Sequence, residues 1–324
     1  MMEINSLQNQ INDALSKRNF GENPRELYEP IRYFTGLGGK RLRPILTILS
    51  HYMFSEEYLE SFEPSLGVEL FHNFTLLHDD IMDEAPLRRG KATVHEKWNK
   101  HIAILSGDAM LVKAYQSISA VNKDILPAVL NAFNKTGLEV CEGQQYDMNF
   151  ESRNDISVDD YLEMIRLKTA VLLGFSLELG GIIAKADQER IEQLRSIGVN
   201  AGLGFQLKDD LLDVFGDKEK VGKQVGGDII SNKKTFLLLK ALELANSSQR
   251  KELDNWLSLE SFDETEKVES VKRIFTELHI DKITQELVNS YFDRSINLLK
   301  SFTVSESRKQ PLMSFLQSLM KRDS

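Results

Sequence analysis

The distribution of proline constrains the fold of this chain more than any other feature. Only seven prolines occur in 324 residues, and none lies between Pro127 and Pro311. Apolar residues recur at spacings of three and four almost throughout, whereas the alternation typical of strands is scarce. Proline breaks helix interiors, so its absence permits long helices. We therefore expect an all-α fold.

The periodicity predicts long helices joined by short connections. They lie at about 3–20, 40–55, 64–83, 93–120, 124–149, 158–185, 188–214 and 232–246, with shorter helices to the end of the chain. No linker-like or low-complexity segment divides the sequence, so we predict a single domain over 1–324. The one long loop, 216–234, is rich in glycine and charge.

Two acidic segments share the pattern DDxxD: DDIMD at 79–83 and DDLLD at 209–213, and each follows an apolar helical run. Helical residues three and four apart share a face, so the first and last aspartates of each segment project the same way. One copy is ordinarily a solvated helix end, but two copies in similar contexts indicate a shared role. Opposed carboxylates repel unless divalent cations lie between them.

The surrounding residues favour magnesium at these segments. The ligands are oxygen only, without cysteine or paired histidine nearby, and Mg²⁺ usually keeps several waters and bridges to phosphates. The first helix carries an apolar stripe of Leu70, Phe74, Leu77 and Ile81. Another face carries Glu69, His72, Asp79 and Asp83, and in the second helix Gln206 shares a face with Asp209 and Asp213. We expect the polar faces to line a cleft.

Composition excludes several function classes. The net charge is −9, with 49 acidic and 40 basic residues, which argues against a nucleic-acid partner. The single cysteine, Cys141, cannot form an intrachain disulfide, so we expect a cytoplasmic location and a buried thiol. The N-terminus is not a secretory signal, and the longest apolar stretch, 170–184, is too short to span a bilayer. We expect no membrane insertion.

Basic residues cluster in four places: Lys40 to Arg43, Arg88 to Lys91, Lys168 beside Thr169, and Lys223 with Lys233 and Lys234 around the long loop. Lys168 precedes a nearly uncharged run, so a wholly solvated position is unfavourable for it. Arginine offers a planar fork for phosphate oxygens, whereas lysine acts as a compact charge. Together these groups could bind two polyanions, one through Mg²⁺ and one directly.

In this order the motifs resemble the trans-isoprenyl diphosphate (polyprenyl) synthases, of the short-chain farnesyl and geranylgeranyl type. The resemblance is carried by GGKRLRP at 38–44, HNFTLLHDDIMDEAPLRRGKATVH at 72–95, GQQYD at 143–147, KT at 168–169, FQLKDDLLDVFGD at 205–217 and GKQVGGDIISNKKT at 222–235. It covers about the middle two-thirds of the chain. It implies an isoprenoid-synthase-type helical bundle around a deep central cavity, usually a homodimer.

The resemblance also implies a reaction, the head-to-tail condensation of an allylic diphosphate with isopentenyl diphosphate. About three Mg²⁺ ions would bind with the diphosphate. The metal residues implied are Asp79, Asp80, Asp83, Asp209 and Asp213. The residues implied to bind the allylic diphosphate are Arg88, Lys168, Thr169, Gln206, Lys223 and Lys233. Those implied to bind isopentenyl diphosphate are Lys40, Arg43, His72 and Arg89. The catalytic residues implied are Lys168, Thr169, Gln206 and Lys223.

These roles are chemically consistent. Cations stabilise charge on the leaving diphosphate, and an apolar cavity shields the allylic cation from water. Phe205, the Thr169 hydroxyl and the Gln206 carbonyl could stabilise positive carbon. The released diphosphate would take the proton, so His78 and His95 are not assigned a catalytic role. The loop at 216–234 is predicted to close over the phosphates.

Product length should depend on what blocks the cavity below the first DDxxD segment. Phe74 is about 7.5 Å along the helix from Asp79, with Thr75 above it and Phe71 one turn deeper; both phenylalanines can also be ordinary core aromatics. An aromatic at this position without an insertion in DDIMD is similar to archaeal-type short-chain enzymes. We predict a C15 or C20 product, with C20 slightly favoured.

Three alternatives stay open. A class I terpene cyclase shares the ionisation chemistry but needs no isopentenyl site. A longer-chain polyprenyl synthase would differ only in its cavity. A non-catalytic subunit of a heteromeric synthase would be expected to lose one DDxxD segment, whereas both are intact.

Overall fold

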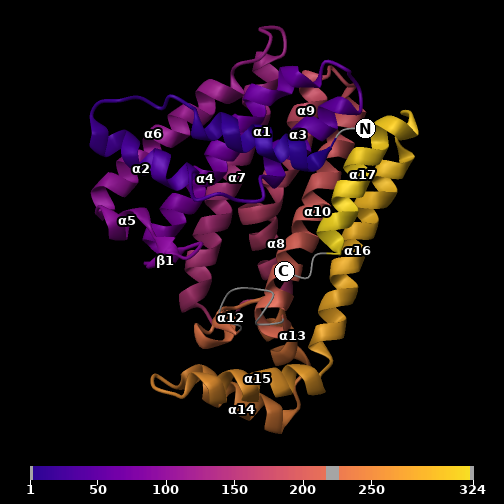
Figure 1. Ribbon diagram of the computed structural model, residues 1–324. Helices are drawn as coiled ribbons and strands as arrows, with labels where there is room; N and C mark the ends of the chain where they lie inside the picture. The colour runs from indigo at the N-terminus through magenta and orange to yellow at the C-terminus, as the bar shows by residue number, and fades with distance from the viewer. Residues whose placement is uncertain (1–2, 217–225, 322–324) are drawn as a thin grey trace. The chain divides into compact units, whose positions relative to one another are not determined.

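The fold is almost entirely helical. A computed structural model describes residues 3–216 and 226–321, and Figure 1 shows helices joined by loops over nearly all of them. The described residues contain one small sheet, of two strands. The all-α prediction is confirmed. No described helix is both long and apolar enough to cross a membrane.

The elements follow one another in short succession. The first helices are α1 (Ile4–Ser16), α2 (Arg25–Thr35), α3 (Leu42–Tyr52), η1 (Tyr58–Ser61) and α4 (Phe62–Met82). A hairpin of β1 (Leu87–Arg88) and β2 (Lys91–Ala92) precedes α5 (Val94–Lys97) and α6 (Lys100–Ile118). Then come α7 (Leu126–Ser152), α8 (Val158–Ile165), the π-helix η2 (Arg166–Ala170), α9 (Val171–Ile183) and α10 (Gln188–Phe215). The last are α12 (Gly227–Ile230), α13 (Phe236–Leu244), α14 (Ser247–Ser258), α15 (Glu264–Glu277), α16 (Ile280–Ser301) and α17 (Glu306–Met320).

The chain forms two compact units. Unit 1 comprises Met1–Asn134, Phe175–Leu194 and Thr303–Leu312; unit 2 comprises Lys135–Gly174, Arg195–Phe302 and Met313–Ser324. In unit 1, α4 packs along α6 and against α3. In unit 2, α13 contacts α8, α15 and α16. The first DDxxD segment belongs to unit 1 and the second to unit 2, while the single domain over 1–324 stays a prediction.

Several element boundaries differ from those predicted. The helix expected at 93–120 is two helices, because the Asn99 side chain accepts a hydrogen bond from the N–H of Ile102 at 2.9 Å and so starts α6 anew. Helix α2 was not predicted. The segment after 246 contains α16, which has 22 residues and is not short.

Cys141 is exposed on α7, so the prediction of a buried thiol was wrong. The buried positions of this helix nearby are Val140, Gly143 and Gln144, and Cys141 falls on the other side with Glu142. Small size alone does not decide which helix face a residue takes.

Candidate active site

Arg41 fixes the loop before α3. Its backbone is left-handed at φ +52°, and its side chain is buried. The guanidinium donates to Glu69 Oε1 at 2.7 Å and to the Thr35 carbonyl at 2.9 Å. Glu69 is therefore a buried partner within unit 1, and the prediction that it faces a cleft was wrong. Lys40 precedes Arg41 in this loop, and Arg43 lies in the first turn of α3.

The β1–β2 hairpin presents two arginines to different neighbours. Its register pairs Leu87 with Ala92, which leaves Arg89 and Gly90 as a two-residue turn. Both turn residues have positive φ, +53° and +74°, as a type I′ turn requires. The Arg88 side chain reaches back to Asp80 on α4.

Arg89 lies against the loop that precedes α3. A Cβ on Gly39 would lie 2.9 Å from Arg89 Nη1, and Gly39 has φ +146°, so only glycine fits here without displacement. Partial burial lowers the pKa of Arg89, and nearby Arg41 lowers it further. Two segments that are far apart in the sequence thus place their arginines together.

His72 lies within this positive cluster. Burial holds the pKa of its imidazole well below the usual range, and four arginines lower it further: Arg43, Arg88, Arg89 and Arg41. Burial also lowers the pKa of Arg43 to about 10, and its Nε has no hydrogen-bond partner among the described residues. A buried N–H without a partner is costly. A ligand with several anionic oxygens would satisfy both the N–H and the charge.

The first DDxxD segment ends α4 and divides into two kinds of aspartate. Asp79 is half-buried and Asp83 exposed, whereas Asp80 is 1% exposed and its two oxygens each lie 2.8 Å from Arg88 Nε. Burial raises the pKa of Asp80, opposed by Arg88. The C-terminal end of a helix is the negative end of its dipole, so Asp79 and Asp83 there favour a bound cation.

In unit 2, the predicted helix over 158–185 contains a π-helical turn at η2. The turn carries Lys168, whose Nζ lies 2.5 Å from Asp147 Oδ2 on α7. A Cβ on Gly143 would clash with the backbone nitrogen of Lys168, so glycine permits this close approach. π-Helical turns are frequent at functional sites.

Thr169 of the same turn begins a hydrogen-bonded chain. Its hydroxyl donates to Gln206 Oε1 at 3.2 Å, and Gln206 Nε2 donates to Asp210 Oδ1 at 3.0 Å. The Tyr161 hydroxyl donates to the other oxygen of Asp210. Burial raises the pKa of Asp210 to about 7, and the charge of Asp228 adds to this rise. Burial also raises the pKa of Tyr161.

The outer aspartates of the second segment are more accessible. Asp209 and Asp213 are half-buried, and Asp213 Oδ2 accepts the backbone N–H of Asp228 at 3.0 Å. The Gly226 N–H donates to the Asp213 carbonyl at 2.7 Å, with Gly226 at φ +90°. Asp213 thus binds the residues that begin α12.

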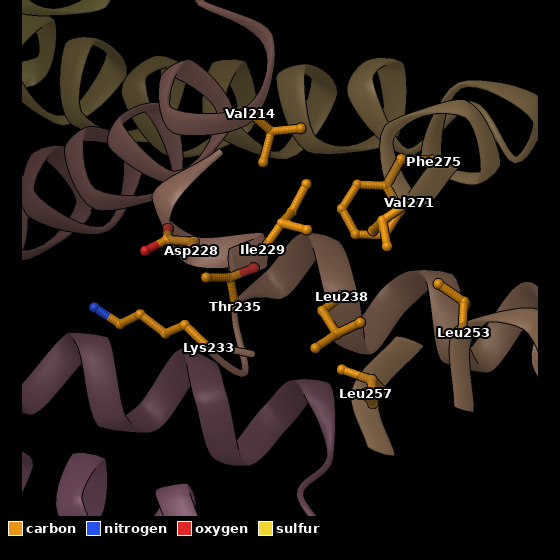
Figure 2. A pocket seen from close by; sticks show the side chains of 10 residues that line it. All are labelled: Val214, Asp228, Ile229, Lys233, Thr235, Leu238, Leu253, Leu257, Val271 and Phe275. Atoms are coloured by element: carbon orange, nitrogen blue, oxygen red, sulfur yellow. The ribbon is translucent and has the colours of Figure 1, made fainter. Parts of the chain in front are cut away.

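Beside α12 lies a cavity of about 20 Å³. Figure 2 shows Asp228, Lys233 and Thr235 on one side and apolar side chains such as Leu253 and Phe275 on the other. The cavity holds about one water molecule and is too small for an isoprenoid chain.

The residues predicted to limit product length form an aromatic cluster in unit 1. The Phe71 and Phe74 rings lie 5.7 Å apart, and Phe71 meets Phe133 edge-on at 5.1 Å. Phe74 also packs on His78 at 4.7 Å. The Thr75 hydroxyl donates to the His72 carbonyl at 2.8 Å. Phe71 is buried, whereas Phe74 is half-buried and lies nearer the DDxxD segment.

Comparison with known proteins decides the family. The family model for polyprenyl synthetases matches residues 24–277. The chain belongs to the polyprenyl synthetase family. Geranylgeranyl pyrophosphate synthase of Geoglobus acetivorans is 35% identical over 321 residues, which cover 97% of this chain and 96% of that protein. A crystal structure of a geranylgeranyl pyrophosphate synthase matches with TM-score 0.95 and 44% identity over 100% of both chains.

A third family member was solved with bound ligands. The polyprenyl synthase from Caulobacter crescentus CB15, solved in complex with calcium and isoprenyl diphosphate, has TM-score 0.87 and 26% identity, covering 99% of this chain and 96% of that chain. These findings confirm the predicted family and the predicted enzyme class, prenyltransferase.

The family's predicted site residues divide between the two units. Unit 1 brings together Arg43, His72 and Arg89, with Arg88 bound to Asp80. Unit 2 brings together Thr169 and Gln206, with Lys168 nearby in sequence and paired with Asp147. Lys223 lies outside the described residues, as does much of the predicted closing loop.

Sequence reasoning missed three residues of these clusters. Asp147 had a signal, because it lies four residues after Gly143 in the GQQYD motif. Asp210 also had a sequence signal. A helix turns about 100° per residue, so Asp210 must point in a different direction from Asp209 beside it. Tyr161 had none, since its partner lies 49 residues away.

Proposed function

We propose that the protein is a Mg²⁺-dependent trans-prenyltransferase that condenses an allylic diphosphate with isopentenyl diphosphate. The product is a C15 or C20 prenyl diphosphate, with C20 slightly favoured. The observation that carries the proposal is the cluster of arginines around neutral His72, in which the buried Nε of Arg43 lacks a partner among the described residues. The names of the relatives, geranylgeranyl pyrophosphate synthases, support the product.

The proposal gives the two diphosphates to two sets of residues. Isopentenyl diphosphate falls to Lys40, Arg43, His72 and Arg89. The allylic diphosphate falls to Arg88, Lys168, Thr169, Gln206, Lys223 and Lys233. Arginine forks suit the terminal oxygens of a diphosphate, and a neutral imidazole among them can donate a hydrogen bond without adding charge repulsion. Lys168 is already paired with an anion, Asp147, so its ammonium is held in place before substrate arrives.

Magnesium would be held by Asp79, Asp83, Asp209 and Asp213, while Asp80 would support the site by anchoring Arg88. Their oxygen-only donor set fits Mg²⁺. Within the described parts of the chain, no three acidic, histidine or cysteine side chains group closely enough to hold a metal alone. About three ions would share diphosphate oxygens and water. When bound, Mg²⁺ supplies Lewis-acid neutralisation of the leaving diphosphate.

The side chains of the protein account for the remaining chemistry. The allylic C–O bond breaks, and its electron pair leaves with the diphosphate, whose charge the Lys168 ammonium stabilises. The Thr169 hydroxyl and Gln206 Oε1 present oxygen dipoles to the positive carbon. The alkene of isopentenyl diphosphate then forms the new C–C bond, and the released diphosphate accepts the proton whose loss restores a double bond.

We also propose a homodimer that acts in the cytoplasm. The exposed apolar residues of α6 include Ile104, Leu105 and Val112, at 43%, 59% and 58%. Leu105 and Val112 are seven residues apart and so lie on one face of the helix. Exposed apolar patches mark interaction surfaces. Light scattering of the purified protein would show a mass near twice 37.0 kDa.

A single incubation tests the proposed reaction. Labelled isopentenyl diphosphate is supplied with Mg²⁺ and a C5, C10 or C15 allylic diphosphate. Incorporation of label into a longer diphosphate supports the proposal. Hydrocarbon formed without label indicates a terpene cyclase, and no turnover indicates a non-catalytic subunit. In the same assay, Arg43→Gln should raise the KM for isopentenyl diphosphate by about tenfold or more.

A further inference from the structure

The middle aspartate of the second DDxxD segment behaves as an interior residue. Asp210 is 4% exposed, whereas Asp209 and Asp213 are half-buried. Both of its oxygens are hydrogen-bonded within unit 2, one by the Tyr161 hydroxyl and one by Gln206 Nε2. Its carboxylate therefore has a different task from those of its neighbours.

That task follows from the hydrogen-bonding capacity of each group. A carboxylate can only accept, so the side-chain amide of Gln206 must turn its NH₂ toward Asp210. The carbonyl oxygen of the amide then faces the Thr169 hydroxyl, which donates to it at 3.2 Å. Without the carboxylate, either end of the amide could face Thr169, because a hydroxyl both donates and accepts.

Tyr161 fixes the carboxylate in turn. The Tyr161 side chain is 1% exposed. Tyr161 lies on α8, the helix that directly precedes the π-helical turn with Thr169. The chain Tyr161–Asp210–Gln206–Thr169 thus ties α8, η2 and α10 together. Asp210 and Gln206 are four residues apart on α10, so the helix itself sets their separation.

We propose that Tyr161 and Asp210 are positioning residues that hold the Gln206 amide with its carbonyl oxygen toward the reacting carbon. This inference rests on the proposed function, in which that oxygen stabilises the positive allylic centre. An inverted amide would present an N–H there instead. The ionisation step would then lose a favourable dipole and gain an unfavourable one.

Asp210→Asn tests the proposal with almost no change in volume. The Tyr161 hydroxyl can donate to the new amide oxygen, which turns the new NH₂ toward Gln206 and inverts the Gln206 amide. We expect kcat to fall by at least about tenfold, with the KM for each diphosphate within about threefold of wild type. Tyr161→Phe should lower kcat in the same direction by a smaller factor.

The matched control is Ser295→Ala. The buried Ser295 hydroxyl donates to the Ile197 carbonyl on α10 at 2.9 Å, so this variant also removes a buried hydroxyl hydrogen bond to the same helix. We expect kcat within about twofold of wild type. Thermal melting of all variants identifies any that fail to fold, in which case Tyr161→Phe replaces Asp210→Asn.

A double-variant cycle separates positioning from a merely structural role. If Asp210 acts through Gln206, then adding Asp210→Asn to Gln206→Ala should change kcat by less than about twofold. A full additional loss, or a raised Mg²⁺ requirement in Asp210→Asn, would overturn the proposal. If the wild-type protein elongates no substrate, the proposed function fails instead. If it elongates and Asp210→Asn matches it, only this inference fails.

Discussion

Arg88 is held on Asp80 by a fork of hydrogen bonds. The guanidinium Nε lies 2.8 Å from both carboxylate oxygens, and Nη2 lies 2.8 Å from one of them. Asp80 is 1% exposed. Asp80, the middle aspartate of the first DDxxD segment, therefore anchors a basic side chain. Asp210 anchors the Gln206 amide in the second segment in a similar way.

Asp80→Asn should separate anchoring from metal binding. The variant keeps its volume but loses the charge that holds Arg88. We expect the KM for the allylic diphosphate to rise about tenfold, because a less restrained arginine costs more to order. The Mg²⁺ concentration for half-maximal activity should stay within about twofold of wild type. Initial rates over a Mg²⁺ titration measure both quantities.

Asp83→Asn is the matched comparison. Asp83 belongs to the same segment but is exposed, and the proposal does not assign it the anchoring of Arg88. We expect its half-maximal Mg²⁺ concentration to rise about tenfold or more. If Asp80→Asn shows the larger shift in Mg²⁺ requirement, the division of roles between the two aspartates is wrong.

The helical class and both DDxxD segments could be predicted because their signals are local. Apolar spacing placed α4 and α10, and Leu70 and Leu77 of the predicted stripe are indeed buried. The β1–β2 hairpin could not be predicted from alternating apolar and polar residues, because strands of two residues are too short to show that pattern. Gly90 after Arg89 was the sole local hint of its turn.

Roles that depend on distant partners could not be predicted. Glu69 shares a helix face with Asp79 by sequence count, yet it is paired with Arg41, 28 residues away. The π-helical turn at Lys168 likewise lacks a local sequence signature, since its neighbours continue as ordinary helix. Such features arise from packing between segments, which periodicity does not record.

Gly143→Ala should disable the Lys168 turn. The added Cβ would clash with the backbone of Lys168, so α7 and η2 must separate. We expect kcat to fall at least about a hundredfold, since small misplacements of a positioning group cost about this much. Steady-state rates with both diphosphates measure the loss.

Gly181→Ala provides the control for that substitution. Gly181 is also helical, but its added Cβ would meet the end of the Leu194 side chain at 2.6 Å, which can move aside. We expect kcat within about threefold of wild type and a modest drop in melting temperature. Equal activity losses in the two variants would mean that alanine acts through general destabilisation.

Phe74→Ala should lengthen the product. Phe74 is the half-buried ring nearest the first DDxxD segment, and its loss leaves the Phe71–Phe133 pair as the next barrier. Chromatography of the dephosphorylated products should show at least one added isoprene unit. Phe275→Leu in α15 is the control, because that buried ring lies in unit 2. An unchanged product from Phe74→Ala would refute the assignment.

His51 should make the protein less stable in mild acid. This α3 residue is 1% exposed, its Nδ1 has no hydrogen-bond partner among the described residues, and burial lowers its pKa from 6.5 to about 4. Below pH 6.5 the unfolded chain takes up a proton that the folded chain does not, so stability falls until about pH 4. At roughly 1.4 kcal/mol per pH unit, this amounts to at most about 3.5 kcal/mol.

Urea unfolding between pH 7 and pH 4 measures this loss. His51→Gln removes the titration, so its free energy of unfolding should fall less over this range than that of wild type, although it starts lower at pH 7. His101→Gln changes an exposed histidine on α6 and should follow the wild-type curve. The explanation fails if His51→Gln has the same pH slope as wild type, because another group must then take up the proton on unfolding.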